Sequence, residues 1–175
     1  SQSDGGGIAN EGSLVVVGGS INFNRAMSNA GGIGNEGFVT LTDTNVSNNI
    51  ASQGDAGGIG TRGGLSILRS TISNNTAGHN AGGIGIADQS GGFIMSPMMS
   101  GPDAVTIVAS KIMGNTAAMN GGGLSLIGDK EVTIEFTEIA DNHAQSGTGG
   151  GVFVSAGELA IEYSAVVNNV AGQVG

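Results

Sequence analysis

The sequence has no cysteine and no tryptophan, and only two of its 175 residues are proline. The lack of cysteine excludes disulfides, thiolate metal sites and cysteine nucleophiles. Positive charge is also scarce, because 5 Lys and Arg face 14 Asp and Glu for a net charge of −9. A chain with no basic stripe is not expected to bind nucleic acid or an anionic membrane surface. No apolar stretch is long enough to span a bilayer, so a membrane span is not expected.

Glycine is abundant, with 35 residues, and it recurs in a pattern. A glycine pair or triplet followed by an aliphatic residue occurs six times, at Ile8, Ile33, Ile59, Ile84, Leu124 and Val152. The first steps are about 25 residues long, a period that fits a leucine-rich repeat or a parallel β-helix. The segments between the aliphatic residues are rich in Gly, Asn, Ser and Thr, which are poor helix interiors. The repeat therefore predicts an all-β, single-stranded parallel β-helix, a solenoid of about six coils.

Each coil is predicted to contain three short strands. The first follows the glycines, and the third carries an aliphatic residue three positions before a recurring Asn. The second alternates strictly, so one set of side chains points into the core and the other points outward. The inward pairs are Leu14/Val16, Val39/Leu41, Leu65/Ile67, Val105/Ile107, Val132/Ile134 and Leu159/Ile161.

One asparagine per coil is expected to form a structural Asn ladder. Its members are Asn24, Asn49, Asn75, Asn115, Asn142 and Asn169, each followed two positions later by Ala. A side-chain amide both donates and accepts, so stacked amides can bond to a tight bend and to one another. Ser or Thr at 44, 70, 110, 137 and 164 is expected to support the preceding corner.

The glycine runs and the Asn segments together resemble a known group of proteins. Stretches such as GGIGNEG and GGGLSLIG, paired with INFNRA and ISNNTA, are similar to the repeats of bacterial cell-surface and secreted β-helices. The polymorphic outer-membrane adhesins, with GGA(I/L/V) and FxxN repeats, are the nearest named family; here Ile or Val stands in place of Phe. The resemblance implies a right-handed solenoid, in line with the general preference for right-handed crossovers, and an extracellular or cell-surface location.

The outward positions offer no convincing catalytic constellation, so an enzyme is not expected. The first-strand column reads Ala9, Gly34, Gly60, Gly85, Ser125 and Phe153. On the second strand, Glu135 and Glu162 form one carboxylate pair, which fits a solvated acidic face better than a site. His79 and His143 are two coils apart, too far to share a metal. No metal site or cofactor is predicted, and a calcium ion held by loop aspartates is the less favoured alternative.

An insertion at about 87–104 is the best candidate interaction site. It carries five large apolar residues, Phe93, Ile94, Met95, Met98 and Met99. One interpretation is a flap over the outward Val17, Leu68 and Val108 column. The other is an adaptable partner-binding patch, since Met-rich surfaces repack readily.

The sequence as a whole is interpreted as one β-helix domain over 1–175. Open solenoid ends expose unpaired strands, so we expect either that the chain is cut from a longer solenoid or that copies stack head to tail into a filament. The expected partners are other proteins or further copies of the chain, bound through the ends or the Met-rich loop, with glycans as further candidates. The leading hypothesis is a non-enzymatic extracellular structural or adhesive solenoid within a larger surface assembly or filament. The alternative is a polysaccharide-binding or polysaccharide-degrading β-helix acting through Glu135 and Glu162.

Overall fold

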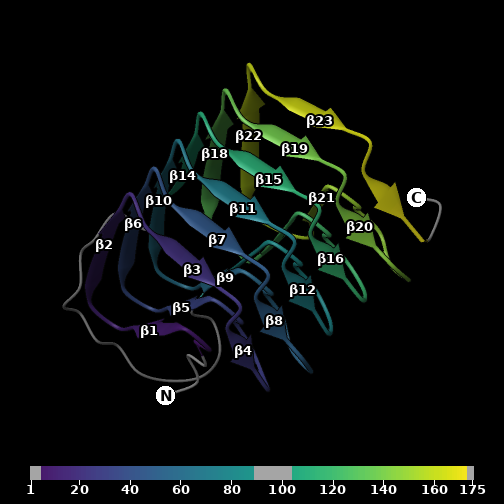
Figure 1. Ribbon diagram of the computed structural model, residues 1–175. Coiled ribbons are helices and arrows are strands. Elements are labelled where there is room, and N and C mark those ends of the chain that lie inside the picture. Colours follow the sequence, from purple (N-terminus) through teal and green to yellow (C-terminus); the bar gives the residue numbers. More distant parts are fainter. Residues whose placement is uncertain (1–4, 89–103, 173–175) are drawn as a thin grey trace.

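The computed structural model of the protein describes residues 5–88 and 104–172. In these ranges, twenty-four short strands, β1 to β24, form four six-stranded sheets in which every pairing is parallel. No helix occurs in these two ranges. Each coil contributes one strand to each sheet, so neighbouring strands in a sheet come from successive coils (Figure 1). The predicted all-β parallel solenoid of six coils is therefore confirmed.

The four sheets are named A to D in the order in which the chain enters them. Sheet A contains β1 (Ile8–Asn10), β5 (Ile33–Asn35), β9 (Ile59–Thr61), β13 (Ile84–Ala87), β17 (Leu124–Ile127) and β21 (Val152–Val154). Sheet B contains β2 (Ser13–Val17), β6 (Phe38–Thr42), β10 (Gly64–Leu68), β14 (Val105–Val108), β18 (Glu131–Glu135) and β22 (Glu158–Glu162). Sheet C contains β3 (Ser20–Asn22), β7 (Asn45–Ser47), β11 (Thr71–Ser73), β15 (Lys111–Met113), β19 (Glu138–Ala140) and β23 (Ala165–Val167). Sheet D contains β4 (Arg25–Ala26), β8 (Ile50–Ala51), β12 (Thr76–Ala77), β16 (Thr116–Ala117), β20 (His143–Ala144) and β24 (Val170–Ala171).

The number of strands per coil differs from the prediction of three, because sheet D adds a fourth. Its strands are only two residues long, and each contains the Ala that follows the ladder Asn. Two residues cannot show an alternating pattern, so periodicity has no means of detecting them.

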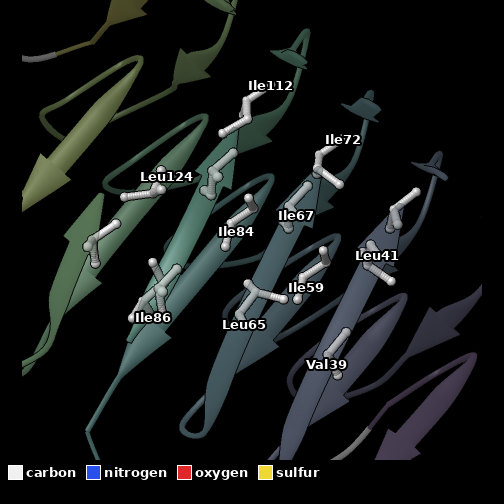
Figure 2. Close-up of a cluster of buried hydrophobic side chains, with 14 of the residues drawn as sticks. Val39, Leu41, Ile59, Leu65, Ile67, Ile72, Ile84, Ile86, Ile112 and Leu124 are labelled. Atoms are coloured by element: carbon white, nitrogen blue, oxygen red, sulfur yellow. The ribbon is translucent and has the colours of Figure 1, made fainter. Parts of the chain in front are cut away.

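The core is a set of aliphatic columns that run along the solenoid. Leu65 lies between Val39 and Val105 in the sheet register, and Ile67 lies between Leu41 and Ile107. The side chains from sheets A, B and C meet in the interior (Figure 2), and the interior coils bury them almost completely. All the predicted inward residues of the second strand lie in these columns. A shift of one residue would turn them toward solvent, so burial of their apolar area stabilises this register.

Three corners of the coil place a residue in the left-handed backbone region, two of them in all six coils and the corner before sheet A in five. The corner between sheets B and C uses Gly18, Asp43, Arg69, Ala109, Phe136 and Tyr163. The corner between sheets C and D uses Phe23, Asn48, Asn74, Gly114, Asp141 and Asn168. The corner before sheet A uses Ala30, Ala56, Ala81, Gly121 and Gly149. Most of these are not glycine, so the coil geometry imposes a conformation that L-residues adopt only at a cost.

The fourth coil leaves sheet A at Ala87 and enters sheet B at Val105. In the coil before it, Thr61 ends β9 and Gly64 already begins β10. The insertion therefore occupies the corner between sheets A and B. β14 nevertheless pairs in register with β10 and with β18, so the ladder of strands continues across it.

Candidate functional site

The six predicted ladder asparagines lie in one column at the corner between sheets C and D. In each step, Nδ2 of one Asn donates to Oδ1 of the Asn in the next coil at 2.9–3.0 Å. The same Oδ1 accepts the backbone N–H of the first Asn at 2.9–3.0 Å. All five steps run in the same direction, from donor in the earlier coil to acceptor in the later one.

From Asn49 onward, the remaining Nδ2 hydrogen of each Asn points the other way. It donates to the carbonyl of the aliphatic residue in the preceding coil, as from Asn75 to Val46 at 3.0 Å and from Asn115 to Ile72 at 2.9 Å. Asn49, Asn75, Asn115 and Asn142 are fully buried. An interior ladder amide thus uses both donors and both lone pairs, which is what a buried amide requires.

A second ladder of hydroxyls lies at the corner between sheets B and C. Each of the oxygens of Thr44, Ser70, Ser110, Thr137 and Ser164 donates to the carbonyl two residues earlier at 2.7–2.9 Å. From Ser70 onward, each also accepts the backbone N–H of the Ser or Thr in the preceding coil at 3.0–3.1 Å. These hydroxyls bond both within and between coils and so fix the corner.

A third polar ladder, which was not predicted from the sequence, lies just before sheet A. Its members are Asn29, Asp55, Asn80, Asn120 and Thr148. Oδ1 of each of the first four accepts the backbone N–H of the next member, at 2.8–3.2 Å. Thr148 ends the ladder, and its hydroxyl donates to Oδ1 of Asn120 at 3.2 Å. A polar residue directly before the left-handed Ala or Gly of every later coil was the available signal. It was hidden because the position holds three residue types, whereas the Asn ladder holds one.

A groove lies on the outer face of sheet A, between this third ladder and the corner that leads to sheet B. It encloses about 190 Å³ and spans β5, β9, β13 and β17. With coils spaced about 4.8 Å apart, that is about 14 Å along the solenoid. The floor is formed by Gly34, Gly60, Gly85 and Ser125. These residues belong to the outward first-strand column that contained no acid, base or nucleophile pair.

The groove exists because small residues line it over three coils, with glycine on the floor and alanine on one wall. Ala30, Ala56 and Ala81 form one wall, and a Cβ added at Gly60 would lie 3.2 Å from the Cβ atoms of Ala30 and Ala56. At Gly85, the added Cβ would lie 3.0 Å from the Ala56 Cβ. Contacts this short are close to the steric limit, so these two floor positions stay glycine although neither needs a positive φ.

The last two coils reverse this arrangement and end the groove. Gly121 and Gly149 replace the wall alanines, while Ser125 and Phe153 replace the floor glycines. A Cβ added at Gly121 would lie 2.8 Å from the Ser125 Cβ, and one at Gly149 would lie 2.8 Å from the Phe153 Cβ. Each coil therefore has room for a side chain on the wall or on the floor, but not on both. Because the fifth coil carries its side chain on the floor, Ser125 lies at the end of the groove.

Ser125 has a second unusual property. It is 1% exposed, and its hydroxyl has no hydrogen-bond partner among residues 5–88 and 104–172. It follows Gly85 in the outward register of sheet A and lines the groove, so its side chain lies on the groove side of the sheet. A buried hydroxyl without a partner costs about 1–3 kcal/mol.

The groove carries more negative than positive charge. Asp55 and Glu36 lie among its lining residues, together with one cation, Arg62. Nη1 of Arg62 lies 3.8 Å from Oε1 of Glu36, and both side chains are partly exposed. Oδ1 of Asp55 accepts from Asn80, and within the described ranges its Oδ2 makes no hydrogen bond.

Of the other predicted site residues, the structure brings together Glu135 and Glu162. Phe93, Ile94, Met95, Met98 and Met99 lie outside the described residues. Glu135 and Glu162 are register partners on the outer face of sheet B, and Glu131 and Glu158 are partners on the same two strands. His143 belongs to sheet D beside Thr116. Across the described ranges, no group of three or more His, Asp or Glu is placed to hold a metal ion.

An aromatic pair at the B–C corner was also not predicted. The rings of Phe136 and Tyr163 are stacked, with centroids 5.2 Å apart and an interplanar angle of 10°. Both side chains are largely exposed. Lower in the same column, Asp43 and Arg69 form a bidentate ion pair, with oxygen–nitrogen distances of 2.8 and 2.9 Å. Hydrogen bonding to the Arg69 guanidinium lowers the pKa of Asp43.

The two end coils leave core positions accessible. In the sixth coil, Val166 is 49% exposed and Ile161 is 38% exposed, although their counterparts Ile139 and Ile134 are fully buried. In the first coil, Ile8, Leu14 and Val16 are half-buried. The two ends therefore present apolar faces built from the same columns.

A comparison of the chain with protein-family models, curated proteins and solved structures finds no match. Within the described ranges, no helix long and apolar enough to cross a membrane is found.

Proposed function

We propose that this protein is a non-enzymatic, extracellular structural solenoid of the adhesive cell-surface type, whose copies assemble end to end into a filament. The observation that carries the proposal is the direction of the Asn ladder. Its last amide, Asn169, has one described acceptor, the Ile139 carbonyl, whereas the interior amides have two. Its first amide, Asn24, donates to Asn49, and within the described ranges its Oδ1 accepts no hydrogen bond.

A second copy stacked head to tail fills these positions in register. Asn169 of one copy donates to Oδ1 of Asn24 in the next, repeating the step that joins Asn24 to Asn49. The apolar columns continue in the same way, with Val166 over Ile21 and Ile161 over Val16. Every added junction buries apolar surface and pairs the strand edges of four sheets. Because the contact joins two different faces, it does not close and it generates a fibre.

The corner columns are compatible with this stacking. Tyr163 ends the B–C corner column, and Gly18 begins it. A Cβ at Gly18 would meet no atom within 4 Å. Stacking would therefore place the Tyr163 ring over a position without a side chain.

Size-exclusion chromatography with light scattering, and electron microscopy of negatively stained particles, test the assembly over a range of concentrations. The wild-type chain is expected to elongate as concentration rises. Val166→Lys places a charge in the end face at a half-exposed position and is expected to stay monomeric. Val15→Lys, on the side of the first coil and 63% exposed, is the matched control and is expected to assemble. A wild-type monomer at every concentration, or assembly of Val166→Lys equal to wild type, contradicts the proposal.

The adhesive, extracellular part of the proposal is supported by the resemblance of the repeats and by the acidic composition. The polysaccharide-degrading alternative depends on Glu135 and Glu162, which the sheet register places side by side. A screen of acidic polysaccharides for turnover, repeated with Glu135→Gln, decides that alternative. Loss of turnover in the variant would favour it over the structural function.

A further inference from the structure

We propose that the groove on sheet A binds a neutral, hydroxyl-rich oligosaccharide chain lying along the solenoid axis, with the buried hydroxyl of Ser125 as the hydrogen-bonding group at its closed end. This inference does not rest on end-to-end assembly, and it places glycan binding on a different face from Glu135 and Glu162.

The shape of the groove sets the first limit on the ligand. The floor is glycine over three coils, and the wall beside it is alanine, so neither provides a deep pocket for a bulky side chain. The groove crosses four coils, about 14 Å at the usual strand spacing. This length accommodates a thin, extended oligomer better than a compact small molecule.

The available hydrogen-bonding groups set the second limit. On the face of a sheet, the backbone groups are already paired with the strands on either side, as the register of β9 with β5 and β13 shows. An extended peptide, which binds a sheet through backbone bonds at its edge, finds no such partner here. Side chains are left, among them the Ser125 hydroxyl and Oδ2 of Asp55, and they suit a ligand that carries many hydroxyls.

Charge sets the third limit. The groove contains two carboxylates, Asp55 and Glu36, and one guanidinium, that of Arg62, which already faces Glu36 at 3.8 Å. The chain as a whole carries a net charge of −9. A polyanionic glycan would be repelled, so the preferred chain is neutral. Sugar rings present both C–H faces and hydroxyl edges, which matches a groove with an apolar floor and alanine wall and with polar side chains at its borders.

Ser125 gives the groove its specific contact. A hydroxyl that stays buried without a partner is a cost to the folded chain, and a ligand hydroxyl reaching the closed end would remove that cost. The same argument predicts two opposite effects of Ser125→Ala. The variant loses the contact to the ligand, but it also loses the unsatisfied group, so the free protein is at least as stable as wild type.

Binding is tested with the full chain carrying Val166→Lys, which keeps the measurement independent of assembly. Cellohexaose and maltohexaose are the neutral probes, an oligogalacturonate is the acidic probe, and a lysine-rich peptide is the probe for a cationic ligand. Amide chemical-shift changes locate the binding, and titration gives the affinity. At least one neutral probe is expected to shift residues of β5, β9, β13 and β17, and the acidic probe is expected to bind at least roughly tenfold more weakly.

Variants connect the binding to the groove. Ser125→Ala is expected to weaken the neutral probe roughly fivefold, the loss of about one hydrogen bond, without lowering the unfolding midpoint. Ser66→Ala is the matched control, because Ser66 lies on the outer face of sheet B beside Thr106, and it is expected to leave binding unchanged. No binding of either neutral hexasaccharide, tighter binding of the acidic probe or the peptide, or equal effects of the two serine variants would overturn the inference.

Discussion

Nδ2 of Asn75 donates a hydrogen bond of 3.0 Å to Oδ1 of Asn115, forty positions further along the chain. Every other step of the ladder joins residues 25 to 27 positions apart. The bond lengths are nevertheless the same within 0.1 Å. Stacking of the coils, not sequence separation, determines the contact.

Asn115→Ala is expected to destabilise the fold by about 3 kcal/mol or more, because it removes two donors and two acceptor positions inside a buried corner. Asn115 receives bonds from Asn75 and donates to Ile72 and Asn142. Urea unfolding measures the change. Asn45→Ala, at an exposed position on sheet C, is the control and should cost under about 0.5 kcal/mol. Equal costs for the two would contradict a structural role for the ladder.

Ser110 is expected to tolerate Thr and not Ala. Its hydroxyl donates to the Val108 carbonyl and accepts the Ser70 N–H, and the same column already holds Thr44 and Thr137. Ser110→Ala leaves that buried N–H without a partner and should cost about 1–2 kcal/mol. Ser110→Thr should cost less than half as much by the same unfolding measurement. The prediction fails if Thr is the worse substitution.

Ala109→Gly is expected to leave stability unchanged or raise it by up to about 1 kcal/mol. Ala109 has a φ of 49°, and the strain of a Cβ in that region is about 1–2 kcal/mol, against which the greater entropy of an unfolded Gly must be set. Ala117→Gly, at a buried strand position with ordinary φ, is the control and should destabilise. Thermal unfolding of both variants checks the sign, and a loss at Ala109 as large as at Ala117 would contradict it.

The Asp43–Arg69 pair predicts a weak pH dependence confined to acid. The folded state lowers the pKa of Asp43 below its ordinary value of 3.8. The stabilising contribution is therefore present above that pH and is lost as pH falls through the lower, folded-state pKa. Both partners are exposed, so the effect is small. Comparing wild type with Asp43→Asn from pH 7 to pH 2 should show a difference that shrinks in acid. A difference that grows there would contradict the assignment.

Much of the fold follows from the repeat, because side chains of one kind recur at one position in every coil. The inward pairs such as Leu65 and Ile67, and the column of Asn75 and Asn115, could be placed in this way. The two-residue strands of sheet D carry no periodic signal. Right-handedness remains a prediction from the resemblance and from the general rule for crossovers.

The groove could not be predicted, because it depends on distances between residues of different columns. The Gly85 position in the sequence shows only that a side chain is missing. The Cβ atoms of Ala56 and Ala81 that explain its absence come from the coil before and from the preceding corner of the same coil. Gly121 stands where the earlier coils have alanine, and Ser125 stands where they have glycine. These two differences can be explained only when the wall and the floor are considered together.

The insertion between Ala87 and Val105 leaves the strand register on either side unchanged. The A–B corner therefore behaves as an attachment point, where the chain can be lengthened without altering the scaffold. The corresponding corners at 36–37 and 62–63 likewise join a strand of sheet A to a strand of sheet B. Foreign peptides grafted there would be displayed in a row along one edge of the rod, at intervals set by the coil spacing.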